Sequence, residues 1–156
     1  ERKWLLAISL IFLFGLIVEI LGVNFSLFFG NYEYGNNLGI KIYGVPIVIG
    51  FNWVLLVMIT GNFADKIFSK NIFFKTIFGS TLMVILDLLI EVVAPKIGYW
   101  EFDINPVPTS NYLWWFIFSI IFNYIYQKSV SNKEYLLSIN ILAIHFLFFG
   151  MLSVFL

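Results

Sequence analysis

Long apolar runs constrain the fold of this 156-residue chain more than any other feature of its sequence. A run of about 17–25 apolar residues can cross a bilayer, and a membrane-crossing segment must satisfy its own backbone hydrogen bonds, which predicts helices. The expected spans are Trp4–Val23, Val45–Asn62, Ile72–Val93, Tyr112–Tyr126 and Tyr135–Leu156. Because the fourth run is short, we expect it to form a thinner or less tilted span.

The composition agrees with an all-α, polytopic membrane helix bundle. Hydrophobic residues make up 61% of the chain and charged residues 12%, whereas soluble domains are near half apolar and a quarter charged. The sequence has no internal repeat and no linker, so we expect residues 1–156 to form a single integral-membrane helical domain. The chain begins with Glu1 rather than Met, so we expect a trimmed N-terminus, and one further helix upstream stays open.

Charge and cysteine content exclude several functions. The formal net charge is zero, so nothing points to a nucleic-acid partner. The chain contains no cysteine, which rules out disulfides and thiolate chemistry. With a single histidine as well, no metal site is expected.

The distribution of basic residues predicts the orientation in the membrane. One set of helix ends and connections carries Arg2, Lys3, Lys66, Lys70, Lys75, Lys128 and Lys133. The opposite set carries only Lys41 and Lys96. Because basic residues favour the cytoplasmic side, we expect a cytoplasmic N-terminus. The two long loops, Asn24–Gly44 and Pro95–Ser110, then lie on the non-cytoplasmic side.

Acidic side chains inside the expected spans point to a function. Asp87 and Glu91 are four residues apart and so share one helical face, and carboxylates in hydrocarbon usually mark functional sites. Glu19 lies near the outer end of the first span. Since two acids on one face repel when both are ionised, we expect at least one to stay protonated. With the orientation above, nearly every buried polar group falls beneath the long loops, which predicts one polar, aromatic-rich pocket.

A protonated acid in such a pocket is a general acid for a weak base, and the weakest base expected in a bilayer is an alkene. Protonation makes a carbocation, which aromatic faces and carboxylates stabilise. The candidate catalytic residues are therefore Asp87, Glu91 and Glu19. The candidate substrate-binding residues are Tyr32, Tyr34, Asn52, Trp53, Trp100, Asn111, Trp115 and His145. The amides, the imidazole and the rings each also have a structural reading, as links between helices or interfacial anchors.

Three signatures in order resemble those of the membrane-integral carotenoid hydratases. The first includes Glu19, Gly22, Tyr32, Tyr34, Val45–Pro46 and Asn52–Trp53. The second is Asp87, Glu91, Val92–Ala94 and Trp100, and the third is Val107–Pro108, Asn111–Tyr112 and Trp115. Val92 stands where the family has proline, and Phe102 where it often has tryptophan. The exact substrate is therefore left open.

The resemblance implies hydration of the terminal double bond of an acyclic carotenoid end, without a cofactor. The implied partners are a carotenoid, water and membrane lipid. In this resemblance, Asp87 or Glu91 would protonate the alkene. The other acid, or Glu19, would stabilise the cation and later accept a proton from the attacking water. Asn52 and Asn111 would hold the water or orient the acids. A proton-initiated end-group cyclase, a non-catalytic lipid- or carotenoid-binding protein or small transporter, and a magnesium–diphosphate site remain alternatives. The oligomeric state is open, a homo-oligomer included.

Overall fold

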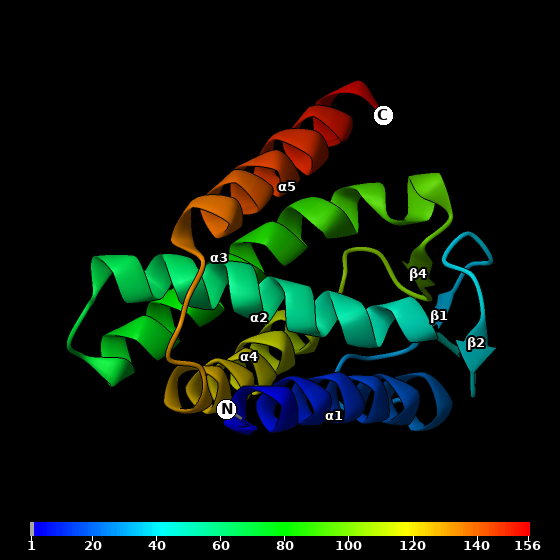
Figure 1. The fold of residues 1–156 in the computed structure, drawn as a ribbon. Coiled ribbons are helices and arrows are strands. Elements are labelled where there is room, and N and C mark those ends of the chain that lie inside the picture. Colours follow the sequence, from blue (N-terminus) through cyan, green and yellow to red (C-terminus); the bar gives the residue numbers. More distant parts are fainter. Residues whose placement is uncertain (1) are drawn as a thin grey trace.

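The computed structural model describes residues 2–156, and this part of the chain forms five α-helices (Figure 1). Glu1 lies outside the described residues. The helices are α1 (Lys3–Phe25), α2 (Ile47–Ile67), α3 (Ile72–Val93), α4 (Thr109–Ser129) and α5 (Tyr135–Phe155). Within residues 2–156, α1, α2, α3 and α5 are long and apolar enough to cross a membrane. The predicted all-α membrane bundle is confirmed.

The fourth helix is longer than its apolar run indicates. The run Tyr112–Tyr126 covers only part of α4, which has 21 residues, and α4 is not among the helices of residues 2–156 that are long and apolar enough to cross a membrane. Polar residues extend the helix at both ends because tertiary contacts satisfy their side chains. Asn111 donates to acids of α3, and Gln127 Nε2 donates to the Gly61 carbonyl oxygen of α2 at 2.7 Å.

Local sequence signals explain where the other helices begin and end. Asn71 precedes α3, and its side-chain oxygen accepts hydrogen bonds from the backbone N–H groups of Phe73 and Phe74. Such a cap satisfies donors that the first turn leaves unpaired. Pro46 and Pro108, both with extended backbone, immediately precede α2 and α4. Pro95 follows the end of α3, where the chain tightens into a short 3₁₀ helix.

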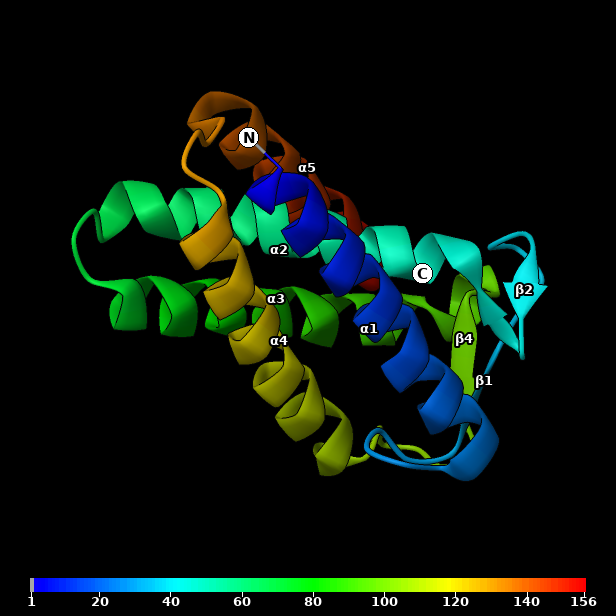
Figure 2. The ribbon, with the colours of Figure 1, turned by 60° about the horizontal axis from the view of Figure 1, so that its bottom comes forward.

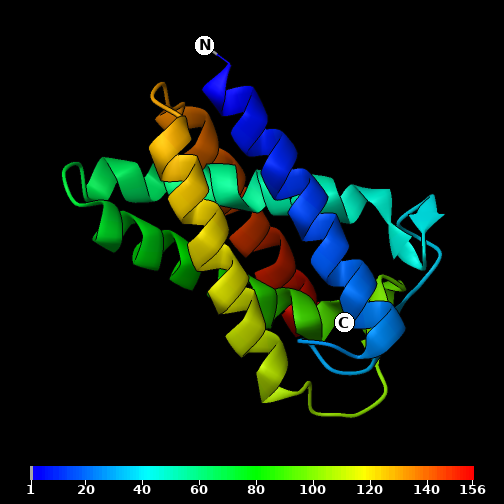
Figure 3. The same cartoon turned by 90° about the horizontal axis from the view of Figure 1, so that it is seen from below.

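The helices pack in layers. Helices α2 and α3 form the middle layer, with α1 and α4 on one side and α5 on the other (Figures 1 and 3). Successive helices run in opposite directions, so the α2–α3 turn and the strands lie at opposite ends of the bundle (Figure 2). Helix α5 is the least buried of the membrane-length helices in residues 2–156. The site described below lies at the strand end, between the middle layer and the α1–α4 side.

Short strands join the two long loops, a pairing that the sequence did not predict. Strand β1 (Tyr32–Tyr34) pairs antiparallel with β4 (Trp100–Phe102). The contact continues at Gly35, whose backbone N–H donates to the Tyr99 carbonyl oxygen at 2.8 Å. A Cβ atom at Gly35 would overlap the carbonyl oxygen of Gly98, so this close approach requires glycine. A second hairpin pairs β2 (Lys41–Ile42) with β3 (Val45–Pro46).

Buried polar side chains also occur far from the strands, so the expectation that nearly all of them gather beneath the long loops is wrong. Asn62 of α2 donates to Ser138 Oγ of α5 at 2.8 Å and accepts from the Tyr126 hydroxyl of α4 at 2.6 Å. Asp65 bonds Lys133 at 3.0 Å near the same end. Helices in lipid gain little from apolar contact alone, and polar links between them add specific attachment. This network attaches the loosely packed α5 to α2 and α4.

Candidate active site

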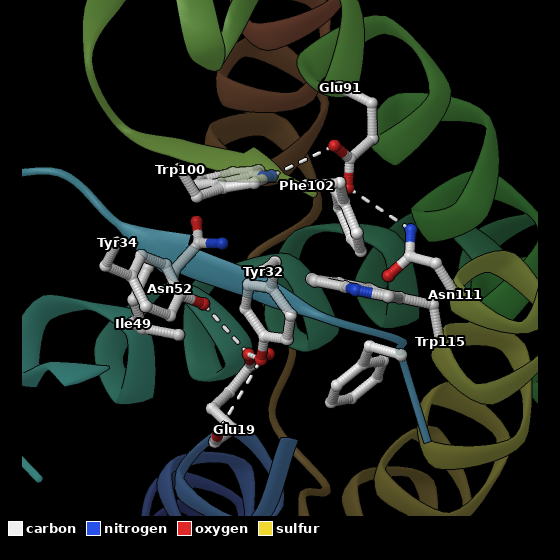
Figure 4. Close-up of a pocket in the computed structure, with 11 residues that line it drawn as sticks. Glu19, Tyr32, Tyr34, Ile49, Asn52, Glu91, Trp100, Phe102, Asn111 and Trp115 are labelled. Carbon is white, nitrogen blue, oxygen red and sulfur yellow. Dashed lines mark hydrogen bonds between the residues drawn. The ribbon is translucent and has the colours of Figure 1, made fainter. Parts of the chain in front are cut away.

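Helix α3 places Asp87 and Glu91 on one buried face, and α4 supplies a donor to both. The Nδ2 atom of Asn111, in the first turn of α4, lies 3.2 Å from Asp87 Oδ2 and 3.2 Å from Glu91 Oε1. Trp100 Nε1 of β4 donates to the other oxygen of Glu91 at 3.0 Å (Figure 4). The salt bridges found among residues 2–156 all involve Asp65. Within that part of the chain, neither Asp87 nor Glu91 is therefore paired with a basic side chain.

Glu19 approaches the same region from α1 and is held by donors from three elements. Its Oε2 accepts from the Tyr32 hydroxyl at 2.6 Å and the Tyr34 hydroxyl at 2.8 Å. Its Oε1 accepts from Trp53 Nε1 at 3.0 Å. The indole N–H can only donate a hydrogen bond. Three donors around the Glu19 side chain therefore suit an ionised carboxylate, which only accepts. Strand β1 is thus attached to the membrane helices through this acid.

The phenols of Tyr32 and Tyr34 act as hydrogen-bond donors at neutral pH. Burial, followed by the nearby Glu19 carboxylate, raises the pKa of Tyr32 well above its ordinary value, and the same causes raise the pKa of Tyr34. Both rings are buried beneath the loops, and they meet edge to face. Their alternation along β1 turns both toward α1, with exposed Glu33 between them.

Trp53 supports the site from below. Its ring is fully buried and stacks on Trp115 of α4, with 4.1 Å between the ring centroids. This stack joins α2 to α4, while the indole N–H reaches Glu19 on α1. Trp53 therefore fixes the position of both a cavity wall and an acid.

Two cavities meet at Glu91. The inner cavity has a volume of about 20 Å³ and is lined by Glu19, Phe29, Tyr32, Tyr34, Ile49, Asn52, Glu91, Trp100, Phe102, Asn111 and Trp115 (Figure 4). The outer cavity, of about 410 Å³, lies between the end of α3, β4, the loop after it and the start of α4. The side chains that line both are Glu91, Trp100 and Phe102. The inner volume suits one water molecule, whereas the outer one can hold several carbon units.

The structure brings together most of the residues selected from the sequence. Glu19, Glu91, Tyr32, Tyr34, Asn52, Trp100, Asn111 and Trp115 line the inner cavity. Asp87 and Trp53 do not line the cavity but bond residues that do. Asp87 accepts a hydrogen bond from Asn111, and Trp53 donates one to Glu19. His145 lies apart on α5, where its Nδ1 is 2.8 Å from the Ile141 carbonyl oxygen. In residues 2–156, no three His, Cys, Asp or Glu side chains are close enough together to hold a metal ion.

Sequence reasoning missed Phe29, Ile49 and Phe102 as lining residues. Phe102 could have been found, because it stands where the family that the sequence resembles often has tryptophan. In the structure, alternation along β4 turns Phe102 and Trp100 to one face. Phe102 also pairs directly opposite Tyr32. For Phe29 and Ile49, ordinary apolar residues in a chain rich in them, no sequence signal distinguishes lining from packing.

The helices and the buried acids define an integral membrane protein whose candidate active site opens between helices near one end of the bundle. The sequence model of the family described as carotenoid biosynthesis protein matches residues 1–156. The chain therefore belongs to the carotenoid biosynthesis protein family, which indicates a role in carotenoid biosynthesis. Comparisons with curated proteins and with solved structures give no match.

Proposed function

We propose that this protein is an enzyme that adds water to the terminal double bond of an acyclic carotenoid end. The observation that carries the proposal is the position of Glu91, whose side chain lines both the water-sized inner cavity and the larger outer cavity. An acid at such a boundary can face an alkene on one side and water on the other. Hydration requires both reactants to reach one centre.

The outer cavity suits the end of a polyene. Val92, Ile104, Pro106 and Tyr112 contribute to its walls. The inner cavity, at about 20 Å³, is too small to admit a carbon chain. A chain that enters the outer cavity would therefore stop at Glu91, so only its terminal double bond would reach the acid.

In the first step, the carboxylic acid of Glu91 gives its proton to the less substituted carbon of the terminal double bond. The π electrons form the new C–H bond, the adjacent carbon becomes a tertiary cation, and Glu91 becomes a carboxylate. Asn111 holds Glu91 and Asp87 through one amide nitrogen. Repulsion between two buried carboxylates favours keeping a proton on one of them. Asp87 thus favours the protonated form of Glu91 before the reaction, and favours its uptake of a proton from water afterwards.

Aromatic faces and Glu19 would stabilise the cation. Trp100 and Phe102 border both cavities, and Tyr32 lies against Phe102 with 5.2 Å between the ring centroids. Ring faces attract cations by roughly 0.5–2 kcal/mol each, more when water is excluded. The Glu19 carboxylate, held by its donors, adds a fixed negative charge that needs no rearrangement during the reaction.

In the second step, a water in the inner cavity attacks the cation through its oxygen lone pair, and one of its protons passes to the Glu91 carboxylate. The product is a tertiary alcohol, and the acid is regenerated without a cofactor. Asn52 is placed to hold this water, since its side-chain amide lines the inner cavity and makes no hydrogen bond to another residue in 2–156. From the basic residues at the opposite end of the bundle, we place the reaction on the non-cytoplasmic side.

The test is conversion in a bacterial host that accumulates lycopene, with the protein confirmed in the membrane. Mass spectrometry should detect a carotenoid that has gained one water, and growth in heavy-oxygen water should label the new hydroxyl. A product isomeric with its substrate would instead indicate the cyclase. An unchanged carotenoid pool would contradict both activities and leave the binding-protein alternative.

A further inference from the structure

A groove opens at the end of the bundle farthest from the strands. It has a volume of about 800 Å³ and lies between the start of α1, the end of α4 and the α4–α5 connection, with α2 beneath. Arg2, Lys3 and Trp4 form one wall, and Met58 and Asn62 lie on the α2 side. Figure 2 shows the N-terminus near the connection that leads into α5.

The groove continues along the seam between α1 and α2. A second cavity, of about 330 Å³, is lined by Ile8, Phe12 and Leu13 of α1 together with Phe51 and Val54 of α2. Ile8 lines both cavities. On α2, Phe51, Val54 and Met58 follow a spacing of three and four residues, so they lie on one helical face. The two cavities are therefore neighbours at Ile8, and we treat them as one path whose lining changes from polar in the groove to mainly apolar along the seam.

The length of this path matches one leaflet of a membrane. Lys3 and Leu13 are ten residues apart on α1, which corresponds to about 15 Å along a helix. The hydrocarbon core of a bilayer is about 30 Å thick, so one leaflet is about 15 Å. A ligand with a polar group at Lys3 and a chain reaching Leu13 would thus span half of the bilayer.

The polar end of the path carries positive charge. Arg2 and Lys3 face Glu134 across the groove, so the charged side chains of residues 2–156 that line it sum to one positive charge. The salt bridges among residues 2–156 lie at Asp65, and neither Arg2 nor Lys3 takes part in them. Trp4 is 46% exposed beside them, as expected of an indole at the level of lipid headgroups. Basic pockets between membrane helices are suited to anionic headgroups.

We propose that this groove binds an anionic phospholipid. The phosphate-containing headgroup lies between Arg2 and Lys3, and Asn132 supplies an amide from the opposite wall. One acyl chain runs past Ile8 to Phe12 along the α1–α2 seam. This groove shares no lining residue with the cavities of the candidate active site, so the test of lipid binding does not depend on the proposed hydration.

Native mass spectrometry of the full chain in mild detergent, titrated with phosphatidylglycerol or phosphatidylcholine, tests this site. We expect phosphatidylglycerol to bind more tightly. The double variant Arg2→Gln/Lys3→Gln should weaken its binding about 30-fold, because each basic residue at an anionic surface contributes roughly a fivefold factor. Phosphatidylcholine binding should change little.

Lys66→Gln/Lys70→Gln is the matched control, because it removes two positive charges at the same end of the bundle but outside the groove. It should leave phosphatidylglycerol binding unchanged. Ile8→Trp, which fills the junction between the two cavities, should weaken both lipids. Equal affinity for the two lipids, or an equal loss in both double variants, would show general surface attraction and overturn the proposal.

Discussion

Replacing Tyr32 with phenylalanine removes one donor from Glu19 and leaves the ring in place. The hydroxyl donates to Glu19 Oε2 at 2.6 Å, and the side chain is only 7% exposed. A hydrogen bond to a charged group contributes about 1.5–3 kcal/mol. Tyr34 donates to the same oxygen at 2.8 Å and would remain. We therefore expect Tyr32→Phe to lower the free energy of unfolding by about 1.5 kcal/mol.

A double-mutant cycle with Glu19→Gln shows whether this loss arises at the carboxylate. In Glu19→Gln an amide NH₂ replaces one acceptor oxygen, so the Tyr32 hydroxyl loses its charged partner. Adding Tyr32→Phe to that background should cost about 1 kcal/mol less than it does alone, which is a coupling typical of contacting residues.

Thermal unfolding in mild detergent, followed by tryptophan fluorescence, provides the assay, because the stacked Trp53 and Trp115 report on the packing of the site. A loss of 1.5 kcal/mol corresponds to a midpoint lower by about 3–6 °C for a chain of this size. Tyr135→Phe is the control, since its hydroxyl makes no hydrogen bond within residues 2–156, and its midpoint should stay within about 1 °C. Additive effects of Glu19→Gln and Tyr32→Phe, or equal midpoints for Tyr32→Phe and Tyr135→Phe, would refute the reasoning.

Two further predictions concern Tyr32 and Tyr34 and the packing of α1 against the loop that carries them. The pKa values of Tyr32 and Tyr34 are higher in the folded chain than in the unfolded chain. Their contribution to stability is therefore complete below about pH 10 and is lost as the pH rises further. The loss is at most about 1.4 kcal/mol per residue for each pH unit. The unfolding midpoint of Tyr32→Phe/Tyr34→Phe should therefore fall less steeply than that of the parent between about pH 10 and 11, and equal slopes would contradict this. Gly22→Ala should destabilise by about 1–3 kcal/mol, since its Cβ would lie 2.8 Å from both Phe29 Cδ2 and the Tyr32 hydroxyl. Gly150→Ala is the control, since no atom of residues 2–156 would lie within 4 Å of its Cβ. An equal loss in both variants would exclude the steric cause.

The helices could be predicted from the sequence because apolar length alone determines whether a segment can cross a bilayer. The run Ile72–Val93 coincides with α3, and the four-residue spacing of Asp87 and Glu91 correctly placed both acids on one face. Asn111 could be assigned to the same end because it begins the next span from that side. These inferences need only the rise and the period of one helix.

The contacts between elements could not be predicted, because they depend on how the helices are rotated. The spans are apolar on nearly every side, so no stripe shows which face packs inward. The Trp53–Trp115 stack and the bond from Trp53 to Glu19 are consequences of that packing. The pairing of β1 with β4 joins three-residue segments far apart in the chain, and alternation over three residues is too short to predict a strand.

Grouping His145 with the pocket relied on its depth along a span, and depth says nothing about the direction of a side chain. The length of α4 was underestimated for a related reason. Its terminal polar residues appear unfavourable in an isolated span, but Asn111 and Gln127 have partners on α3 and α2. Tertiary hydrogen bonds thus extend a helix beyond its apolar run.

The most direct measurement of the central claim is the carotenoid profile of hosts that produce Glu91→Gln, Asp87→Asn or Glu33→Gln at equal membrane levels. Glutamine keeps the size of Glu91 and can still accept from Trp100, but it cannot deliver the acidic proton. Glu33 is exposed on β1 and lines neither cavity. The account predicts that the carotenoid carrying one added water disappears in Glu91→Gln and Asp87→Asn and persists in Glu33→Gln. Retention of that product in Glu91→Gln at the parental level would contradict it.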